Sequence, residues 1–121
     1  MKTTILIADD SQHDREQLIE LLAGADVEIV AQAVNGVEAV TRFRKLRPAL
    51  VLMDLVMPQM SGIEAGRAIL AYDRTAKIIA VSALSHPSVM TEVQQVGMLA
   101  FVGKPVDREK LLGEIRAATS R

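Results

Sequence analysis

Residues 49–72 read ALVLMDLVMPQMSGIEAGRAILAY and have the pattern of one strand, one loop and one helix. The apolar run 49–53 is short and rich in branched side chains, which is typical of a strand buried on both faces of a parallel sheet. Asp54 follows this run directly, and Met57-Pro58 continues as a loop. From about Gly62 to Tyr72 the apolar residues return at helical spacing. The stretch therefore predicts a strand that ends in an aspartate and leads into a helix.

The same alternation of strand and helix recurs along the whole chain. Further strands are expected over 4–8, 27–33, 77–81 and 99–102, and further helices over 13–23, 36–46, 87–96 and from Asp107 onward. We expect Gly24 to be the C-cap of the helix over 13–23. In the helix over 36–46, four apolar residues are expected to form one inward stripe: Val37, Val40, Phe43 and Leu46. The alternation predicts α/β class, with βα units wound on both faces of one parallel sheet and a single domain over residues 1–121.

Composition limits the function classes before any site is considered. The chain has 121 residues, half of them apolar, and no Cys, so it needs no disulfides and has no thiolate chemistry. A net charge of −1 predicts neither a nucleic acid nor an anionic membrane as partner, and the cations of residues 42–47 suit a solvated helix end. No apolar run approaches the length of a membrane span. We expect a soluble, cytoplasmic protein.

Polar residues follow four of the predicted strands at the point where each strand ends. They are Asp9-Asp10, Asp54, Ser82-Ala83 and Lys104-Pro105. Ligand sites of parallel α/β sheets form at the carboxyl ends of the strands. If the strand order is 2-1-3-4-5, these four strands are adjacent and the polar residues converge on one pocket.

The residue types in this pocket suit phosphoryl transfer. Three carboxylates held close need a compensating cation, and hard oxygen ligands favour Mg²⁺. Lys104 adds fixed positive charge, Ser82 offers a hydrogen bond, and Asp54 is the best placed nucleophile for forming an acyl phosphate. Each residue alone also has an ordinary structural interpretation: Asp9-Asp10 as helix caps, Asp54 as the opening of a turn and Lys104 as a solvated strand end.

The combination resembles the receiver domains of two-component response regulators. The resemblance runs through LIADDS at 6–11, VLMDLVMPQMSG at 51–62, VSAL at 81–84 and AFVGKP at 100–105. Within the family the sequence is most similar to stand-alone chemotaxis regulators of the CheY type. The resemblance implies a flavodoxin-like three-layer sandwich, (βα)5, with the strand order 2-1-3-4-5.

The resemblance also implies a role for each residue of the pocket. Asp54 corresponds to the phosphoacceptor, Asp10 to the direct Mg²⁺ ligand and Asp9 to a residue acting through metal-bound water. The remaining positions are the Val56 carbonyl as the last protein ligand of the metal, Ser82 as the switch hydroxyl, Lys104 as the phosphoryl-binding lysine, Phe101 as the switch aromatic and Lys104-Pro105 as a cis peptide.

The function implied by the resemblance is a phosphorylation switch rather than an enzyme. A sensor histidine kinase or a histidine phosphotransfer protein would supply the phosphoryl group, and a protein target would bind the face formed by residues 87–96, 99–102 and the last helix. The chain would be a monomer or a phosphorylation-dependent dimer. Val56 and Leu84 occupy positions where family members tune hydrolysis of the acyl phosphate, and because both are apolar here we expect slow dephosphorylation.

Two other function classes are compatible with parts of the sequence. The first is a receiver cut from a longer DNA-binding transcriptional regulator. The second is an aspartyl-phosphate phosphatase, but such enzymes usually carry a second Asp two residues after the nucleophile, where this chain has Val56. A phosphorylation-dependent dimer would favour the first of these classes, and a persistent monomer would favour the stand-alone regulator.

Overall fold

Five parallel strands form one sheet in the order β2-β1-β3-β4-β5, within residues 2–120, which the computed structural model describes. The strands are β1 (Thr3–Ala8), β2 (Val27–Ala33), β3 (Leu50–Met53), β4 (Ile78–Ser82) and β5 (Ala100–Gly103). The helices are α1 (Gln12–Leu21), α2 (Gly36–Leu46), α3 (Gly62–Tyr72), α4 (Pro87–Val96) and α5 (Arg108–Thr119). The predicted α/β class, alternation and strand order are confirmed.

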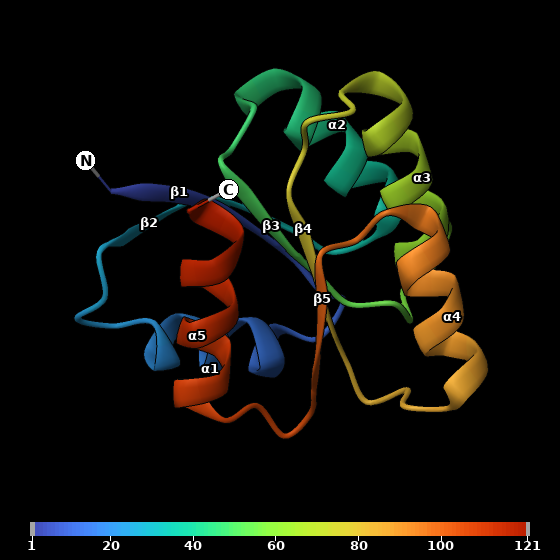
Figure 1. Ribbon diagram of the computed structural model, residues 1–121. Helices are drawn as coiled ribbons and strands as arrows, with labels where there is room; N and C mark the ends of the chain where they lie inside the picture. Colours follow the sequence, from blue (N-terminus) through green and yellow to red (C-terminus); the bar gives the residue numbers. More distant parts are fainter. Residues whose placement is uncertain (1, 121) are drawn as a thin grey trace.

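The helices cover both faces of the sheet and create two separate cores. Figure 1 shows α2, α3 and α4 on one face, with α1 and α5 on the other. Side chains of alternating strand residues supply both cores: Leu6, Val51 and Ile78 point into the first, while Ile5, Leu52 and Ile79 point into the second. β3 is buried at every position, as expected for a strand with helices on both faces.

Helix starts follow from short polar side chains. Ser11, Asn35, Ser61 and Asp107 are N-caps whose side chains accept a hydrogen bond from a main-chain N–H of the first turn. Ser61 and Glu64 complete a reciprocal capping box, which fixes where α3 begins after the loop that carries Asp54. These caps fix the residue at which each of the four helices begins.

Two details of the predicted helices are wrong. The C-cap of α1 is Leu22, and Gly24 lies two residues further on with φ +83° in the turn before β2. In α2 the inward stripe includes Val40 and Phe43, but Val37 and Leu46 are each 45% exposed. A step of three residues falls about 60° short of a full helical turn, so residues nine positions apart lie on opposite sides of the helix. The buried stripe follows the spacing 36, 39, 40 and 43 instead.

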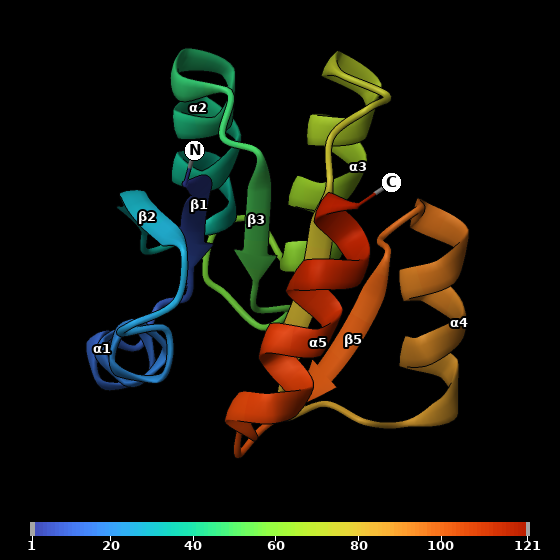
Figure 2. The same ribbon diagram turned by 60° about the vertical axis from the view of Figure 1, so that its left-hand side comes forward.

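The carboxyl ends of the strands form one edge of the molecule. Figure 2 shows the arrowheads of β1, β3 and β5 pointing to this edge, where the loops that lead to the following helices begin. Each predicted strand boundary is within one residue of the observed one, and Ser82 is the last residue of β4 rather than the first residue after it. Among residues 2–120, none of the helices has the length and apolar character needed to span a bilayer.

Candidate phosphoryl-transfer site

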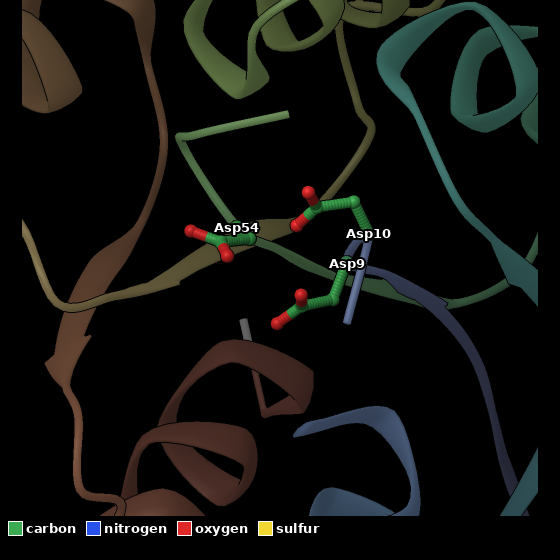
Figure 3. A group of neighbouring side chains, drawn as sticks. All are labelled: Asp9, Asp10 and Asp54. Atoms are coloured by element: carbon green, nitrogen blue, oxygen red, sulfur yellow. The ribbon is translucent and has the colours of Figure 1, made fainter. Parts of the chain in front are cut away.

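Three carboxyl groups meet where β1 and β3 end. Asp9 and Asp10 follow β1, and Asp54 follows β3, the neighbouring strand. One carboxylate oxygen of each residue lies within 4.8 Å of the other two, and Figure 3 shows the three groups gathered on one side of the strand ends. The main-chain N–H of Asp54 donates a hydrogen bond to the carbonyl of Ala8 at 2.9 Å, which ties the two strand ends together.

Lys104 supplies the positive charge of the site. It follows β5, yet its Nζ donates hydrogen bonds to Oδ2 of Asp9 and Oδ2 of Asp14, each at 2.7 Å, and to Oδ2 of Asp54 at 3.1 Å. Burial by itself would lower the pKa of Lys104, but the hydrogen bonds to its carboxylate partners outweigh burial and raise the pKa above the ordinary lysine value. The ammonium group is therefore charged at neutral pH.

The carboxylates around this lysine have different surroundings. Asp9 is 1% exposed, and burial raises the pKa of its carboxyl despite hydrogen bonds from Lys104 and from the main-chain N–H of Ser11. Asp14 lies on the first turn of α1, and the hydrogen bond from Lys104 lowers the pKa of its carboxyl. Asp10 is exposed to solvent. The site thus combines two buried carboxyl groups, Asp9 and Asp54, with the more accessible Asp10 and Asp14.

Asp54 and Lys104 line a pocket of about 370 Å³ that Ser82 and Ala83 also border. Ser82 is 1% exposed, and its Oγ accepts a hydrogen bond from the main-chain N–H of Leu84 at 3.3 Å. A larger hollow of about 590 Å³ lies between β2 and α2 and contains none of these groups. The chemistry of the lining side chains, not the volume, therefore identifies the site.

Close backbone packing holds the loop after β3. A Cβ atom at Gly62 would overlap the main-chain carbonyl of Asp54, so only glycine allows α3 to begin this close to the acidic residue. The main-chain N–H of Gly62 also donates to the carbonyl of Leu55 at 3.0 Å. The position of Asp54 is thus fixed by β1 on one side and by the start of α3 on the other.

The structure brings the predicted pocket residues together. Asp9, Asp54 and Lys104 are in direct contact, and Ser82 borders the same pocket. Phe101 lies on β5 away from the carboxylates, partly buried against the core beneath α2, α3 and α4. The Lys104-Pro105 peptide is cis, as expected.

Two residues of the site were missed from the sequence. Gly62 was expected only as the start of a helix, and Asp14 received no role. The signal for Asp14 is weak, because an acidic residue in the first turn of a helix ordinarily complements the helix dipole. Only the three-dimensional structure reveals that this carboxylate reaches Lys104.

The three aspartates also fit a divalent cation. Their ligand atoms are hard carboxylate oxygens, one of them on the exposed Asp10, and they lie close enough to share one ion. Val56 also lines the same pocket. The donor set contains no nitrogen or sulfur ligand, which favours Mg²⁺ over zinc.

Comparison with known proteins agrees with this geometry. The family model of the response regulator receiver domain matches residues 5–116. The chain belongs to this family. Protein CcdB of Bacillus subtilis is 37% identical to this receiver domain over 110 residues, which are 91% of this chain and 92% of that protein. Chemotaxis protein CheY of the same organism is 36% identical over 115 residues, covering 95% of this chain and 96% of CheY.

A solved structure shows the same fold. The CheX–CheY–BeF3–Mg²⁺ complex of Borrelia burgdorferi superposes on this receiver domain with a TM-score of 0.91 at 30% identity, covering 94% of this chain and 87% of that one. Receiver domains bind Mg²⁺ at an acidic pocket, and this chain brings Asp9, Asp10 and Asp54 together in one acidic group. Two-component signalling and the receiver fold expected from the sequence are confirmed.

Proposed function

We propose that this receiver domain is a phosphorylation-activated switch that accepts a phosphoryl group onto Asp54 from a sensor histidine kinase or a histidine phosphotransfer protein. The observation that carries the proposal is the position of the Asp54 carboxylate, which borders an open pocket and lies 3.1 Å from the ammonium of Lys104. A carboxylate beside a fixed cation suits nucleophilic attack on an anionic phosphoryl group.

The reaction itself requires little from the protein beyond position and charge. An Asp54 carboxylate oxygen attacks phosphorus, and the bond from phosphorus to the donor nitrogen or oxygen breaks. The electron pair of that bond stays with the leaving group. A leaving group that is basic enough takes up a proton from solvent, and a weakly basic one departs as the anion. The product is a mixed anhydride between the Asp54 carboxyl and phosphate.

The surrounding residues have separate roles in this proposal. Lys104 holds negative charge on the phosphoryl oxygens, and the Ser82 hydroxyl donates a hydrogen bond to one of them. Asp9, Asp10, Asp54 and the Val56 carbonyl would hold Mg²⁺, with Asp10 as a direct ligand and Asp9 acting through metal-bound water. When bound, the cation supplies the additional positive charge that an anionic phosphoryl group needs beside several carboxylates.

The proposed output face consists of α4, β5 and α5. Figure 2 shows β5 between these two helices. Ser82 and Gly103 are register partners at the ends of β4 and β5, and Phe101 stands two residues earlier on β5, paired with Ala80. Movement of Ser82 toward a phosphoryl group would free space for Phe101 to turn inward, which would change the face that a partner protein binds.

Acetyl phosphate with Mg²⁺ provides the test. Intact-mass spectrometry should show one phosphoryl increment on the wild type and on Asp26→Asn, which alters an exposed aspartate before β2. Asp54→Asn should show none, and chelation of Mg²⁺ should suppress the increment on the wild type. An increment that survives in Asp54→Asn would overturn the assignment of the phosphoacceptor.

The proposal favours a stand-alone regulator of the CheY type. Its support is the similarity to chemotaxis protein CheY of Bacillus subtilis, which is 36% identical to this chain over 115 residues. The alternative is the receiver of a longer DNA-binding regulator, in which phosphorylation drives dimerisation through α4, β5 and α5. Sedimentation of the phosphorylated chain separates the two: a persistent monomer supports the first proposal, and a phosphorylation-dependent dimer supports the second.

A further inference from the structure

Asp14 on α1 is a partner of Lys104 that the roles described above do not include. Its Oδ2 accepts a hydrogen bond from Lys104 Nζ at 2.7 Å, which is as short as the bond to Asp9 and shorter than the 3.1 Å bond to Asp54. Asp14 comes from a helix, whereas the other two carboxylates follow strands. Its side chain is 31% exposed, and the side chain of Asp9 is only 2% exposed.

The number of protons on the ammonium limits what Lys104 can bind at one time. An ammonium group has three N–H donors, and Lys104 directs hydrogen bonds to three carboxylates. A phosphoryl group on Asp54 adds further acceptors beside this lysine. For Lys104 to bind a phosphoryl oxygen, it must give up or share one of its present bonds.

The three bonds differ in how easily they can be released. Asp9 is buried, and its carboxylate would lose the one cationic side chain that contacts it within residues 2–120. Asp54 carries the phosphoryl group and stays beside the lysine. Asp14 is partly exposed, so water can replace the lysine around its carboxylate at small cost. The bond to Asp14 is therefore the one expected to break.

We propose that Asp14 is a competing anion for Lys104, holding the lysine in the unphosphorylated protein and releasing it to an arriving phosphoryl group. Asp14 acts through Lys104 and is a positioning residue, not a catalytic one. The inference rests on the proposed phosphorylation of Asp54. Because the competition stabilises the unphosphorylated state, removing it should increase both the rate of phosphorylation and the affinity for a phosphoryl mimic.

The opposite role would give the opposite sign. If Asp14 instead held Lys104 in the orientation that the reaction needs, its loss would slow phosphorylation. Asp14→Asn removes the charge but keeps an oxygen that can accept a hydrogen bond, while Asp14→Ala removes both. Competition predicts that both variants react faster than the wild type, with Ala at least as fast as Asn. Orientation predicts that both react more slowly, with Ala the slower.

The fold offers variants that leave the rest of α1 intact. The N-cap Ser11 accepts its hydrogen bond from the main-chain N–H of residue 14, at 3.2 Å, and this bond does not depend on the Asp14 side chain. Glu16→Gln is the matched control. Glu16 is an exposed residue of the same helix, its carboxylate accepts from Gln12 at 2.9 Å, and its replacement changes the net charge by the same amount.

The experiment measures initial rates of phosphoryl incorporation from acetyl phosphate with saturating Mg²⁺, followed by intact mass. Affinity for beryllofluoride with Mg²⁺, followed by NMR, is the second readout and does not depend on turnover. Both Asp14 variants should exceed the wild type about three- to tenfold in each measurement, as expected for the loss of a partly exposed ion pair. Glu16→Gln should match the wild type.

The possible failures are distinguishable. If the wild type gains no phosphoryl group, the proposed function fails and this inference fails with it. If the wild type is phosphorylated but the Asp14 variants are equal to it or slower, only the inference is overturned. An equal increase in Glu16→Gln would also overturn it, since the effect would then come from overall charge and not from the contact with Lys104.

Discussion

Two groups of charged residues lie at opposite ends of the strands and differ mainly in burial. Arg47 and Asp73, beside the strand starts, approach to 3.1 Å, the same distance as Lys104 and Asp54 beside the strand ends. The Arg47 side chain is 56% exposed and stacks over Tyr72, while that of Lys104 is 17% exposed. Water screens the first pair, whereas the second can act on a bound anion. Distance alone does not separate a surface ion pair from a reactive site.

The largest effect that tests this comparison is expected from Lys104→Met. Its phosphorylation rate should fall by about 100-fold, on the scale of losing one preorganised donor in an active site. Without Mg²⁺ its free energy of unfolding should also fall, by about 1–3 kcal/mol, because Asp9 loses its buried cationic partner. Phosphoryl incorporation and urea denaturation measure the two effects.

Arg47→Met is the matched control for this prediction. Arg47 belongs to the exposed group and lies as close to its carboxylate partner, Asp73, as Lys104 lies to Asp54. Its replacement should leave phosphorylation unchanged and should shift the urea midpoint less than Lys104→Met does. Equal effects of the two variants on phosphorylation would mean that burial does not distinguish the clusters.

Gly62→Ala should have the next largest effect, since it disturbs the backbone that holds Asp54. The added methyl group meets the Asp54 carbonyl, so the free energy of unfolding should fall by about 1–3 kcal/mol and phosphorylation should slow. Gly113→Ala in α5 is the control, because a Cβ there meets no atom within 4 Å. It should stabilise the protein by about 0.5–1 kcal/mol through helix propensity. Destabilisation of both variants to the same extent would contradict the packing argument.

Smaller effects are expected at the exposed rim of the pocket. Val56 and Leu84 are 56% and 44% exposed, and neither side chain can orient an attacking water. The wild type should therefore lose its phosphoryl group slowly, and Val56→Asn or Leu84→Gln should accelerate the loss by up to about tenfold. Val34→Asn alters another exposed valine and should leave the decay unchanged. Fast decay of the wild type that polar residues do not accelerate would refute this prediction.

The smallest effect concerns the exposed cluster and its pH dependence. Hydrogen bonds from the hydroxyl and main-chain N–H of Thr75, and then from Arg47, lower the pKa of Asp73. A carboxyl whose pKa is lowered by folding stabilises the folded state at pH values above its ordinary pKa of about 3.9. This stabilisation is lost as the pH falls through the pKa that the group has in the folded state. Asp73→Asn should therefore lower the urea midpoint slightly at pH 7 and not at pH 3. A larger difference at pH 3 would have the wrong sign.

Prediction from the sequence succeeded where one residue type has one strong local preference. Branched apolar runs at 5–8 and 50–53 gave the strands, and the acidic and basic residues after them marked the site. The prediction failed for the inward face of α2 because residues spaced three apart were assigned to one face, although a helical turn has 3.6 residues. Which residues are exposed, here Val37 and Leu46, depends on how the helix is rotated against the sheet. The site roles, the partners and the cytoplasmic location stay predictions.

The sequence by itself determined the order of strands and helices, the residues at the strand ends and the family. These follow from short-range preferences and from motifs that recur in the same order along the chain. Only the tertiary structure decided that Lys104 contacts Asp14 as well as Asp9 and Asp54. The reason is physical: these two residues are 90 positions apart and meet only in the folded chain, and no local sequence pattern records that approach.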